Sequence, residues 1–401
     1  MRYLIVGGGI AGITCARRLK NLDRDAKVTI LSGEQTTYAR IALPHLLAGS
    51  LTANQLAIPM DNDITIVGGT QVTAVIPDAH RVETDRAGEF QYDRLLLATG
   101  AEAIRPELDR IRSPRVFTVR NLADITNINH HLAAESFHKR VILYGAGLVS
   151  MELADALVRR GYSVVILVSS RRLLSRILDE AAGDFVKGLL VSPGVEVHVQ
   201  EQIVHIRDTS RGVIVYTESG RAYEGDLLIL GKGVRSSIGF LQSSGIDIDD
   251  GIVVDEFLKT SRDDIYAAGD VCQGFDRVRN QQRVNALWPV AVEQGRHAAL
   301  AMTGRAIPYR GSFARNVLQV LGHTIVTAGV FDDEAIEVFH RCDNDRYAAI
   351  FAIHGRLAGF AFININIKIG AYITALDQAR TIAKLKDILL SGSLSYQHLC
   401  Q

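Results

Sequence analysis

The 401-residue sequence has few cysteines and no excess of either charge. Its four cysteines are scattered and form no CxxC pair, and 44 basic residues balance 44 acidic ones. Scattered cysteines argue against a disulfide framework and fit a reducing compartment, so we expect a cytoplasmic protein. A balanced charge provides no global field that would attract nucleic acid or an anionic membrane, and we expect neither as a partner.

Long apolar runs are also missing. The most apolar stretch, residues 347–373, is interrupted by His354, Arg356 and Lys368, so we expect no membrane span. The first apolar strand already begins at Tyr3, and we therefore expect no signal or transit peptide. With 47% hydrophobic and 22% charged residues, the chain has a globular composition and the length for two or three domains.

The sequence does contain a glycine-rich turn between an apolar strand and a helix. Residues 3–6 are predicted as the strand, and the helix is predicted from Ala11 onward. Between them lie Gly7, Gly9 and Gly12 in GxGxxG spacing. The first glycine permits the tight turn, the second lets a pyrophosphate approach the backbone, and the third lets helix and strand pack closely. The free N–H groups and the positive end of the helix dipole then favour phosphates.

An acidic residue follows at the distance that such a turn requires. A second strand, residues 27–31, comes after the helix, and Glu34 lies 22 residues beyond Gly12. This is the usual place of the carboxylate that accepts hydrogen bonds from an adenosine ribose. A glycine-rich turn can also be a plain tight loop, but here strand, turn, helix, strand and acid occur in order. Together they predict a dinucleotide site.

A second turn of this kind follows a strand predicted at residues 141–144. Gly145 and Gly147 occupy the first two glycine positions, and Ser150 occupies the third. The small serine side chain lies where helix and strand touch, and we expect it to be tolerated through a slight separation of the two. Two such turns predict either two dinucleotide sites in one chain, or one dinucleotide site and a degenerate one.

The residues that follow the next strand, 163–168, do not decide which nucleotide the second turn binds. No carboxylate follows this strand, whereas Arg171 and Arg172 come soon after it. An NADH site ordinarily has an acid there, and a 2′-phosphate favours arginine and hydroxyl groups. NADPH binding, NADH binding and a vestigial site beside two solvated arginines are three open interpretations.

Four further motifs are similar to those of one flavoprotein family. They are YDRLLLATGA (92–101), GDLLILGKGVRSSIGFL (225–241), LKTSRDDIYAAGDVC (258–272) and NALWPVAVEQGRHAA (285–299). With the two glycine turns they make nearly the whole chain resemble the FAD-dependent pyridine nucleotide-disulphide oxidoreductases. Within that family the chain is most similar to rubredoxin and ferredoxin reductases, and to the flavin-binding front part of assimilatory NAD(P)H nitrite reductases.

The resemblance implies two cofactors, FAD and either NADH or NADPH. Asp270 ends an apolar strand, and ligands collect at such strand ends in open α/β sheets, although an acid there can also cap a turn. The helix near Trp288 would point toward the flavin. The residues predicted to bind the nicotinamide nucleotide are Gly145, Gly147 and Glu152. The residues predicted to bind FAD are Gly7, Gly9, Ile10, Ala11, Gly12, Glu34, Arg40, Ala98, Thr99, Gly100, Gly269, Asp270 and Trp288.

The resemblance also implies where a redox-active cysteine would lie, and the sequence has none there. Similar coenzyme A-disulfide reductases carry that cysteine where this chain has Ile41. Thiolate chemistry needs an exposed sulfur near the flavin. Cys15 lies inside the first predicted helix, where we expect it to be buried, and Cys272 is badly placed for hydride chemistry. We therefore expect no cysteine relay.

The segment around His45 resembles the flavin-side segment of the ferredoxin-reductase branch, which has a lysine at this position. In that branch the lysine pairs with a glutamate that matches Glu152. The resemblance thus implies His45 and Glu152 as catalytic residues, with a protonated imidazole stabilising the reduced flavin below its own pKa. The alternative interpretation is that His45 merely caps the short helix HLLAG.

Other polar residues give weaker signals. His130, His131 and His138 lack metal-ligand spacing, and we predict no metal site. Lys232 lies in a motif expected near the nicotinamide, although an exposed lysine needs no function to explain it.

The order of the motifs predicts an α/β protein with two Rossmann-like nucleotide-binding domains and a C-terminal α+β interface domain. Antiparallel strands and a helical end are predicted after Thr303. In the family this domain often mediates dimerisation, and monomers also occur, so a homodimer is one expected state. The predicted domains are residues 1–111 and 234–303 for FAD, 112–233 for NAD(P), and 304–401 for the interface.

The sequence therefore predicts an FAD-dependent NAD(P)H oxidoreductase of the electron-transfer type. In such enzymes hydride passes from the nicotinamide to the flavin, and the protein positions and tunes these cofactors. The expected acceptor is a small electron-transfer protein, such as a rubredoxin or ferredoxin, or a companion redox subunit. The alternative is a flavin-binding subunit or redox-gated interaction protein whose nicotinamide site has decayed.

Overall fold

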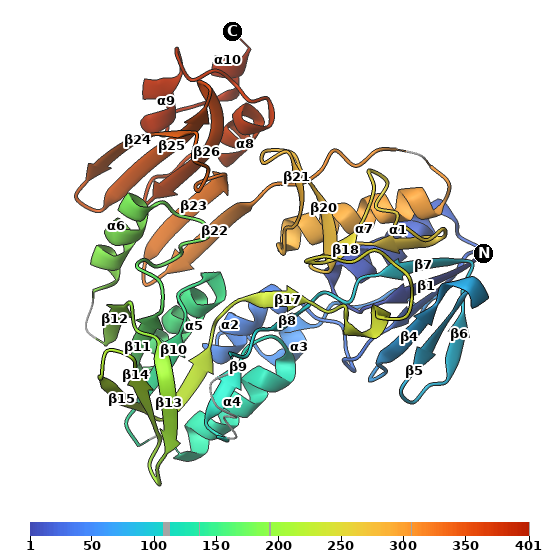
Figure 1. The fold of residues 1–401 in the computed structure, drawn as a ribbon, viewed down its shortest axis with the longest axis horizontal. Coiled ribbons are helices and arrows are strands. Elements are labelled where there is room, and N and C mark those ends of the chain that lie inside the picture. Colours follow the sequence, from blue (N-terminus) through green and yellow to red (C-terminus); the bar gives the residue numbers. More distant parts are fainter. Residues whose placement is uncertain (107–112, 136, 192–193, 306, 401) are drawn as a thin grey trace. The chain divides into compact units, whose positions relative to one another are not determined.

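The computed structural model describes residues 1–106, 113–135, 137–191, 194–305 and 307–400 (Figure 1). The chain forms two compact units, and each of them collects segments that are far apart in the sequence. The first unit comprises Met1–Ala42, Ala53–Glu102 and Val234–Phe313. The second unit comprises Leu43–Thr52, Ala103–Gly233 and Ala314–Gln401.

A five-stranded sheet forms the centre of the first unit. Its order is β19-β7-β1-β2-β3, and all neighbouring strands run parallel. The central strands are apolar and largely buried, as parallel strands are when other elements cover both faces of the sheet. The strands are β1 (Arg2–Val6), β2 (Lys27–Leu31), β3 (Ile64–Val67), β7 (Arg94–Leu97) and β19 (Ile265–Ala267).

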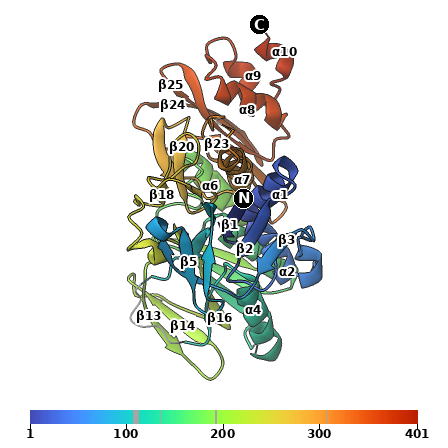
Figure 2. The same cartoon turned by 90° about the vertical axis from the view of Figure 1, so that its right-hand side faces the viewer.

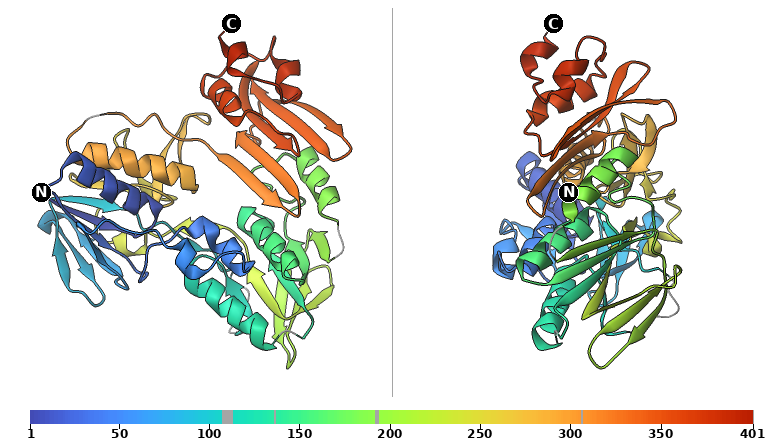
Figure 3. Two further views of the ribbon diagram at one scale, coloured as in Figure 1. Left: turned by 180° about the vertical axis from the view of Figure 1, so that it is seen from behind. Right: turned by 90° about the vertical axis from the view of Figure 1, so that its left-hand side faces the viewer.

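Two long helices of the first unit, α1 (Ile10–Leu22) and α7 (Trp288–Met302), lie side by side although they are far apart in the sequence (Figures 1 and 3). Gly295 makes this approach possible, because a Cβ there would come 2.4 Å from the Ala11 carbonyl oxygen. The Cys15 and Met302 sulfurs lie 3.8 Å apart in the core between these helices. The packing joins the first glycine turn to the segment that closes the unit.

Smaller sheets and short helices complete the first unit. The strands β4-β5-β6 form an antiparallel sheet, of which β5 is labelled in Figure 2. On it the Arg81 guanidinium forms ion pairs with Glu83 and Glu89. Strand β8, where the chain leaves this unit, pairs with β17, where the chain returns. These elements are β4 (Val72–Ile76), β5 (Arg81–Thr84), β6 (Glu89–Gln91), β8 (Ala101–Ala103), β17 (Val234–Ser236), β18 (Ile252–Val253), β20 (Cys272–Asp276), β21 (Gln281–Val284), α3 (Ala53–Leu56), η1 (Arg40–Ala42), η2 (Pro77–Ala79) and η3 (Gly239–Leu241).

The second unit repeats the arrangement of the first around another parallel sheet, of order β12-β11-β10-β16-β9. A three-stranded antiparallel sheet, β13-β14-β15, shares its core. The elements are β9 (Val116–Thr118), β10 (Arg140–Tyr144), β11 (Ser163–Val168), β12 (Val195–Val199), β13 (Ile203–Asp208), β14 (Val213–Thr217), β15 (Ala222–Gly225), β16 (Leu227–Leu230), α4 (Leu122–Glu135), α5 (Leu148–Arg159) and α6 (Glu180–Leu190). The predicted strand–turn–helix–strand orders are confirmed in both units.

One short segment joins the second unit rather than the first, a feature that the sequence did not indicate. Helix α2 (Leu43–Leu47) packs against α4 and α5. The Arg160 guanidinium donates hydrogen bonds to the Leu47 carbonyl oxygen (2.9 Å) and to the Asn129 side chain (2.5 Å). A hydrogen bond between residues so distant in sequence leaves no local signal, so sequence periodicity alone cannot predict it.

The C-terminal part of the second unit contains five antiparallel strands in the order β22-β23-β26-β25-β24, with short helices packed on them (Figures 1 and 3). The helical end is split, because Ala379 adopts a φ of 43° after the first helix. The elements are β22 (Arg315–Val320), β23 (His323–Gly329), β24 (Ile336–Asp343), β25 (Arg346–Ile353), β26 (Arg356–Ile363), α8 (Ile369–Asp377), α9 (Lys386–Leu390) and α10 (Tyr396–Leu399).

The α/β fold class is therefore confirmed. The predicted domain limits at residues 111, 233 and 303 remain predictions, and the two compact units described above are a separate division of the chain. Among the helices that the structure describes, none combines the length and the apolar composition needed to cross a bilayer.

The contact between α1 and α7 can be tested with two helical glycines. Gly295→Ala is expected to destabilise the protein by about 1–3 kcal/mol, because its Cβ would overlap a backbone carbonyl that cannot rotate away. Gly188→Ala in α6 is the matched control: its Cβ would meet no atom within 4 Å, so the better helix propensity of alanine should add about 0.5–1 kcal/mol. Urea unfolding followed by circular dichroism measures both, and a Gly295→Ala protein as stable as wild type would contradict the close approach.

Candidate functional site

The first glycine turn is built by backbone atoms in very close contact. The Gly7 N–H donates to the Leu31 carbonyl oxygen at 2.8 Å, which joins the end of β1 to the end of β2. Gly7 has a φ of 121°, and a Cβ there would lie 2.0 Å from the Ala98 carbonyl oxygen. Both facts require glycine at this position. The turn is therefore fixed by its contact with the neighbouring strand β7.

The other two glycines of the turn leave space for a ligand and bring the helix close. Gly9 is the N-cap of α1, makes no side-chain cap, and a Cβ there would meet nothing within 4 Å. Ile10 and Ala11 then begin the helix. A Cβ at Gly12 would lie 2.1 Å from the Gly7 carbonyl oxygen. A helix N-terminus with uncapped amides in open space is suited to a phosphate group.

The second turn repeats these hydrogen bonds one by one. The Gly145 N–H donates to the Leu167 carbonyl oxygen at 2.8 Å, as Gly7 does to Leu31. Gly145 has a φ of 118°, and Gly147 is the N-cap of α5 with nothing within 4 Å of its Cβ position. The second turn thus has the geometry of an intact dinucleotide-binding turn.

A compensating exchange explains why a serine is tolerated in the second turn. In the first turn, position 12 is glycine and the residue facing the turn on the next strand is Ala98. In the second turn, Ser150 is buried and the residue facing the turn is Gly231, whose added Cβ would lie 2.0 Å from the Ser150 Oγ. The hydroxyl therefore occupies the space that a side chain at 231 would need. The serine fits because the residue that faces it, on the neighbouring strand, is a glycine.

The acid predicted to bind the adenosine ribose of FAD has a partner in the first unit. The Glu34 carboxylate accepts a hydrogen bond from the Arg40 guanidinium at 2.6 Å, and both side chains are about one-third exposed. The Glu34 N–H donates to the Ser32 hydroxyl, and the Arg40 guanidinium also lies over the Tyr38 ring. The structure therefore brings Glu34 and Arg40 together just beyond β2.

The remaining predicted FAD residues lie at the carboxyl ends of β7 and β19 and at the start of α7. The Thr99 hydroxyl donates to the Ser237 carbonyl oxygen at 2.9 Å, and Gly100 has a φ of 72°. Gly269 has a φ of 83°, and a Cβ there would come 3.0 Å from the Ala11 Cβ. Asp270 follows it, and Trp288 is half-buried at the first turn of α7.

Gln294 belongs to this region and was missed by the sequence analysis. Its buried side chain accepts a hydrogen bond from the Gly269 N–H at 2.8 Å, which ties α7 to the end of β19. An amide side chain on the buried face of an apolar helix was the available signal, because a buried polar group must find a partner. Gln294 holds the backbone beside Asp270 rather than the ligand itself.

Taken together, the first unit fits the adenosine and pyrophosphate part of FAD. Gly7, Gly9 and Gly12 form a cradle that side chains would fill, and the uncapped N-terminus of α1 opens onto it. All thirteen residues predicted for FAD lie in this unit. The residues predicted for the nicotinamide nucleotide, and His45, lie in the second unit.

His45 and Glu152 do not form the predicted pair. Among the described residues, no hydrogen bond or ion pair joins them, although α2 packs against α5. His45 is the third residue of α2 and exposed, so the alternative interpretation as a helix cap is wrong as well. Burial, with a smaller contribution from Asp155, raises the pKa of the Glu152 carboxyl to about 7. Glu152 can therefore exchange a proton near neutral pH.

The residues after β11 are polar and cationic, as predicted. Ser169 is the first of them, and its hydroxyl accepts a hydrogen bond from the Lys232 ammonium at 2.7 Å. Arg171 is exposed. The Arg172 guanidinium reaches the Ser175 carbonyl oxygen at 3.5 Å. Lys232 is thus placed beside the strand end where a ribose-binding acid ordinarily stands.

The cysteines of the first unit are inaccessible. Cys15 and Cys272 are both completely or almost completely buried, and burial raises the pKa of each thiol. Ile41 is 58% exposed at the position where a redox cysteine would lie. Across the described part of the chain, no group of three His, Cys, Asp or Glu side chains is arranged to hold a metal ion.

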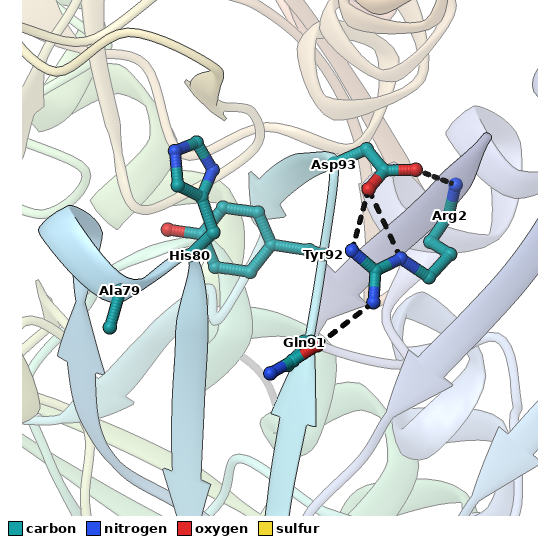
Figure 4. A pocket seen from close by; sticks show the side chains of 6 residues that line it. All are labelled: Arg2, Ala79, His80, Gln91, Tyr92 and Asp93. Atoms are coloured by element: carbon teal, nitrogen blue, oxygen red, sulfur yellow. Dashed lines mark hydrogen bonds and ion pairs between the residues drawn. The ribbon is translucent and has the colours of Figure 1, made fainter.

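A hollow of about 430 Å³ in the first unit lies beside the start of the motif at residues 92–101 (Figure 4). The Arg2 guanidinium donates to the Asp93 carboxylate and to the Gln91 side chain, and these residues, with His80 and Tyr92, line the hollow. None of the predicted cofactor residues lines it.

Two units, each with a glycine turn at the carboxyl edge of a parallel sheet, define a protein that binds two dinucleotides. The model of the pyridine nucleotide-disulphide oxidoreductase family matches residues 1–295, and the chain belongs to this family. It is therefore an NAD(P)H-linked oxidoreductase that uses FAD.

Individual relatives are similar over most of the chain. The NADH-dependent phenylglyoxylate dehydrogenase subunit epsilon of Aromatoleum evansii is 28% identical over 376 residues, which cover 90% of this chain and 88% of that protein. The rubredoxin-NAD(+) reductase of Pseudomonas putida is 29% identical over 279 residues, with coverages of 67% and 71%. A putidaredoxin reductase in its covalent complex with putidaredoxin has the same fold, with a TM-score of 0.89, 22% identity, and coverages of 100% and 98%.

The exchange of serine and glycine predicts a measurable coupling. Gly231→Ala alone should destabilise the protein by about 1–3 kcal/mol, because the new Cβ displaces the Ser150 hydroxyl. Ser150→Ala should restore most of that loss in the double variant, since the two Cβ positions are 3.4 Å apart. A double-mutant cycle from urea unfolding measures the coupling energy. Additive effects of the two substitutions would contradict the explanation.

Glu152 predicts a pH dependence of stability. Folded Glu152 keeps its proton up to about pH 7, whereas the unfolded carboxyl releases it near its ordinary value of 4.5. Wild-type stability relative to Glu152→Gln should therefore fall as the pH rises between these values, by roughly 3 kcal/mol in total. Urea unfolding between pH 4.5 and pH 8 measures the difference. Glu218→Gln, at an exposed turn position, is the control and should follow wild type at every pH.

Proposed function

We propose that this chain is an FAD-dependent NAD(P)H oxidoreductase that delivers electrons to a protein acceptor without a cysteine relay. The observation that carries the proposal is that the described residues of the FAD-binding unit include no accessible cysteine thiol. Ile41 is exposed where a reactive cysteine would stand, and Cys15 and Cys272 are buried with raised thiol pKa values. A thiolate must be accessible to act as a nucleophile, so these two cannot serve.

The chain's own residues bind and orient the cofactors. FAD, when bound, supplies the chemistry that takes a hydride from a nicotinamide and releases electrons to an acceptor. The amides around Gly9 hold its pyrophosphate, and Glu34, oriented by Arg40, accepts hydrogen bonds from its ribose. Asp270 binds the middle of the cofactor, beside the backbone that Gln294 holds.

In the second unit, the amides around Gly147 hold the pyrophosphate of the nicotinamide nucleotide. Glu152 and His45 are the proposed catalytic residues, now as separate groups. A pKa near 7 supports a proton-exchanging role for Glu152, because general acid–base groups work best near the operating pH.

The nature of the acceptor is supported by the relatives. The name of one similar protein states that it reduces rubredoxin, and the name of another states that it is a subunit of an NADH-dependent dehydrogenase. A small electron-transfer protein or a companion redox subunit is therefore the proposed partner. A homodimer and a cytoplasmic location stay predictions.

The second candidate is a flavin-binding subunit whose nicotinamide site has decayed. One observation favours it: Ser169 stands where an acid ordinarily binds the ribose. The intact hydrogen bonds of the second turn and the fitted exchange of Ser150 and Gly231 favour a functional site instead.

An anaerobic titration separates these functions. The purified, FAD-loaded protein should be bleached fully by about one equivalent of NADH or NADPH per FAD, because flavin is the only two-electron group. Alkylation of the exposed Cys342 and Cys400 should leave this bleaching, and the reduction of an added rubredoxin or ferredoxin, unchanged.

A requirement for two equivalents per FAD, or a loss of acceptor reduction on alkylation, would show a thiol relay. Absence of bleaching by both nucleotides, with FAD still bound, would establish the decayed nicotinamide site instead.

A further inference from the structure

Three neighbouring strands of the second unit bring a lysine to the ribose end of the nucleotide turn. β11, β10 and β16 are adjacent and parallel, so their carboxyl ends meet at one edge of the sheet. Ser169 follows β11, Tyr144 ends β10, and Lys232 lies just beyond β16. The Lys232 Nζ is 2.7 Å from the Ser169 Oγ and 4.2 Å from the centre of the Tyr144 ring. These contacts hold the ammonium at the strand end.

The side chains that follow β11 distinguish a ribose with free hydroxyls, as in NADH, from a ribose with a 2′-phosphate, as in NADPH. A carboxylate after the second strand accepts hydrogen bonds from the free ribose hydroxyls of NADH. Here the position holds a hydroxyl that already accepts from a lysine. An ammonium can donate hydrogen bonds but cannot accept them, and its positive charge attracts an anion. Lys232 is partly buried, and burial lowers the pKa of its ammonium because the charged form loses part of its hydration. A bound anion would offset this desolvation cost of the charged lysine.

Other charges around this position are favourable. The Arg176 guanidinium lies over Gly233, where an added Cβ would come 3.6 Å from its Nη1, and Arg171 is exposed just after Ser170. Glu201, whose N–H donates to the carbonyl oxygen of Val168 at the end of β11, is engaged by other partners: its carboxylate accepts hydrogen bonds from Arg221 and Ser219, both at 2.8 Å. It leaves the positive charge beside Ser169 uncompensated.

We propose that Lys232, with Ser169 and Arg176, forms the binding site of a 2′-phosphate, and that the chain prefers NADPH to NADH. Lys232 comes from the loop after β16, not from the segment after β11 that ordinarily distinguishes the two nucleotides. The inference rests on the proposed function, because it requires the second turn to bind a nicotinamide nucleotide.

Calorimetric binding of two fragments to the FAD-loaded protein tests the site without turnover. The probes are 2′,5′-ADP, which carries the 2′-phosphate, and 5′-AMP, which lacks it. Wild type should bind 2′,5′-ADP at least about tenfold more tightly than 5′-AMP, the lower range for a charge-assisted hydrogen bond. Lys232→Met should remove about tenfold of this preference, because the ammonium is lost while most of the apolar stem is kept. Lys187→Met, in α6, is the control and should keep the preference of wild type.

A second variant tests the same site by adding charge. Ser169→Asp should reverse the preference, because its carboxylate repels the phosphate, pairs with Lys232 and accepts hydrogen bonds from ribose hydroxyls. Equal binding of both probes to wild type, or an unchanged preference in both variants, would overturn the inference and leave the proposed function intact. Failure of wild type to bind either probe would overturn both, since the second turn would then hold no nucleotide.

Discussion

Backbone-to-backbone contact at the two glycine turns is the constraint on which both cofactor sites depend. At Gly7 and Gly145 the chain turns so tightly that a Cβ would lie 2.0 and 2.2 Å from a carbonyl oxygen of the neighbouring strand. This approach places the N-terminus of the following helix directly above the strand ends. The proposed phosphate binding rests on that placement, because the first amides of the helix have no partner within the helix.

The same constraint is met with different residues in the two units. In the first unit the third motif position is Gly12 and the strand beside the turn is followed by Ala98, whereas in the second unit the third position is Ser150 and the facing residue is Gly231. What is limited is the combined volume of the two side chains, because helix and strand share one small space. A departure from the glycine motif at one position is therefore not evidence of decay until the facing residue has been considered.

The proposal of electron transfer without a cysteine relay rests on where the first unit keeps its thiols. Cys15 packs against Met302 between α1 and α7, and Cys272 lies inside β20. Both serve as small apolar side chains in the core. The exposed Ile41 stands where the resemblance implies a reactive cysteine. In the proposed function the cofactors carry the redox chemistry, and the protein binds and orients them.

The strand–turn–helix order of both units, the positions of the glycines and the lack of a cysteine at position 41 could be predicted from the sequence, because each depends on residues close together in the chain. Contacts between distant segments could not. Examples are the attachment of α2 to the second unit through Arg160 and the hydrogen bond from Gly269 to Gln294.

The sequence by itself determined the class of fold and the two dinucleotide turns, since hydrophobic periodicity and glycine spacing act over a few residues. The tertiary structure alone decided which strand faces each turn, and so why Ser150 is tolerated and why Lys232 stands beside Ser169. The reason is physical: parallel neighbours in a sheet are separated by whole crossover connections. Residues that share one strand edge are therefore far apart in the chain, and only packing brings them together.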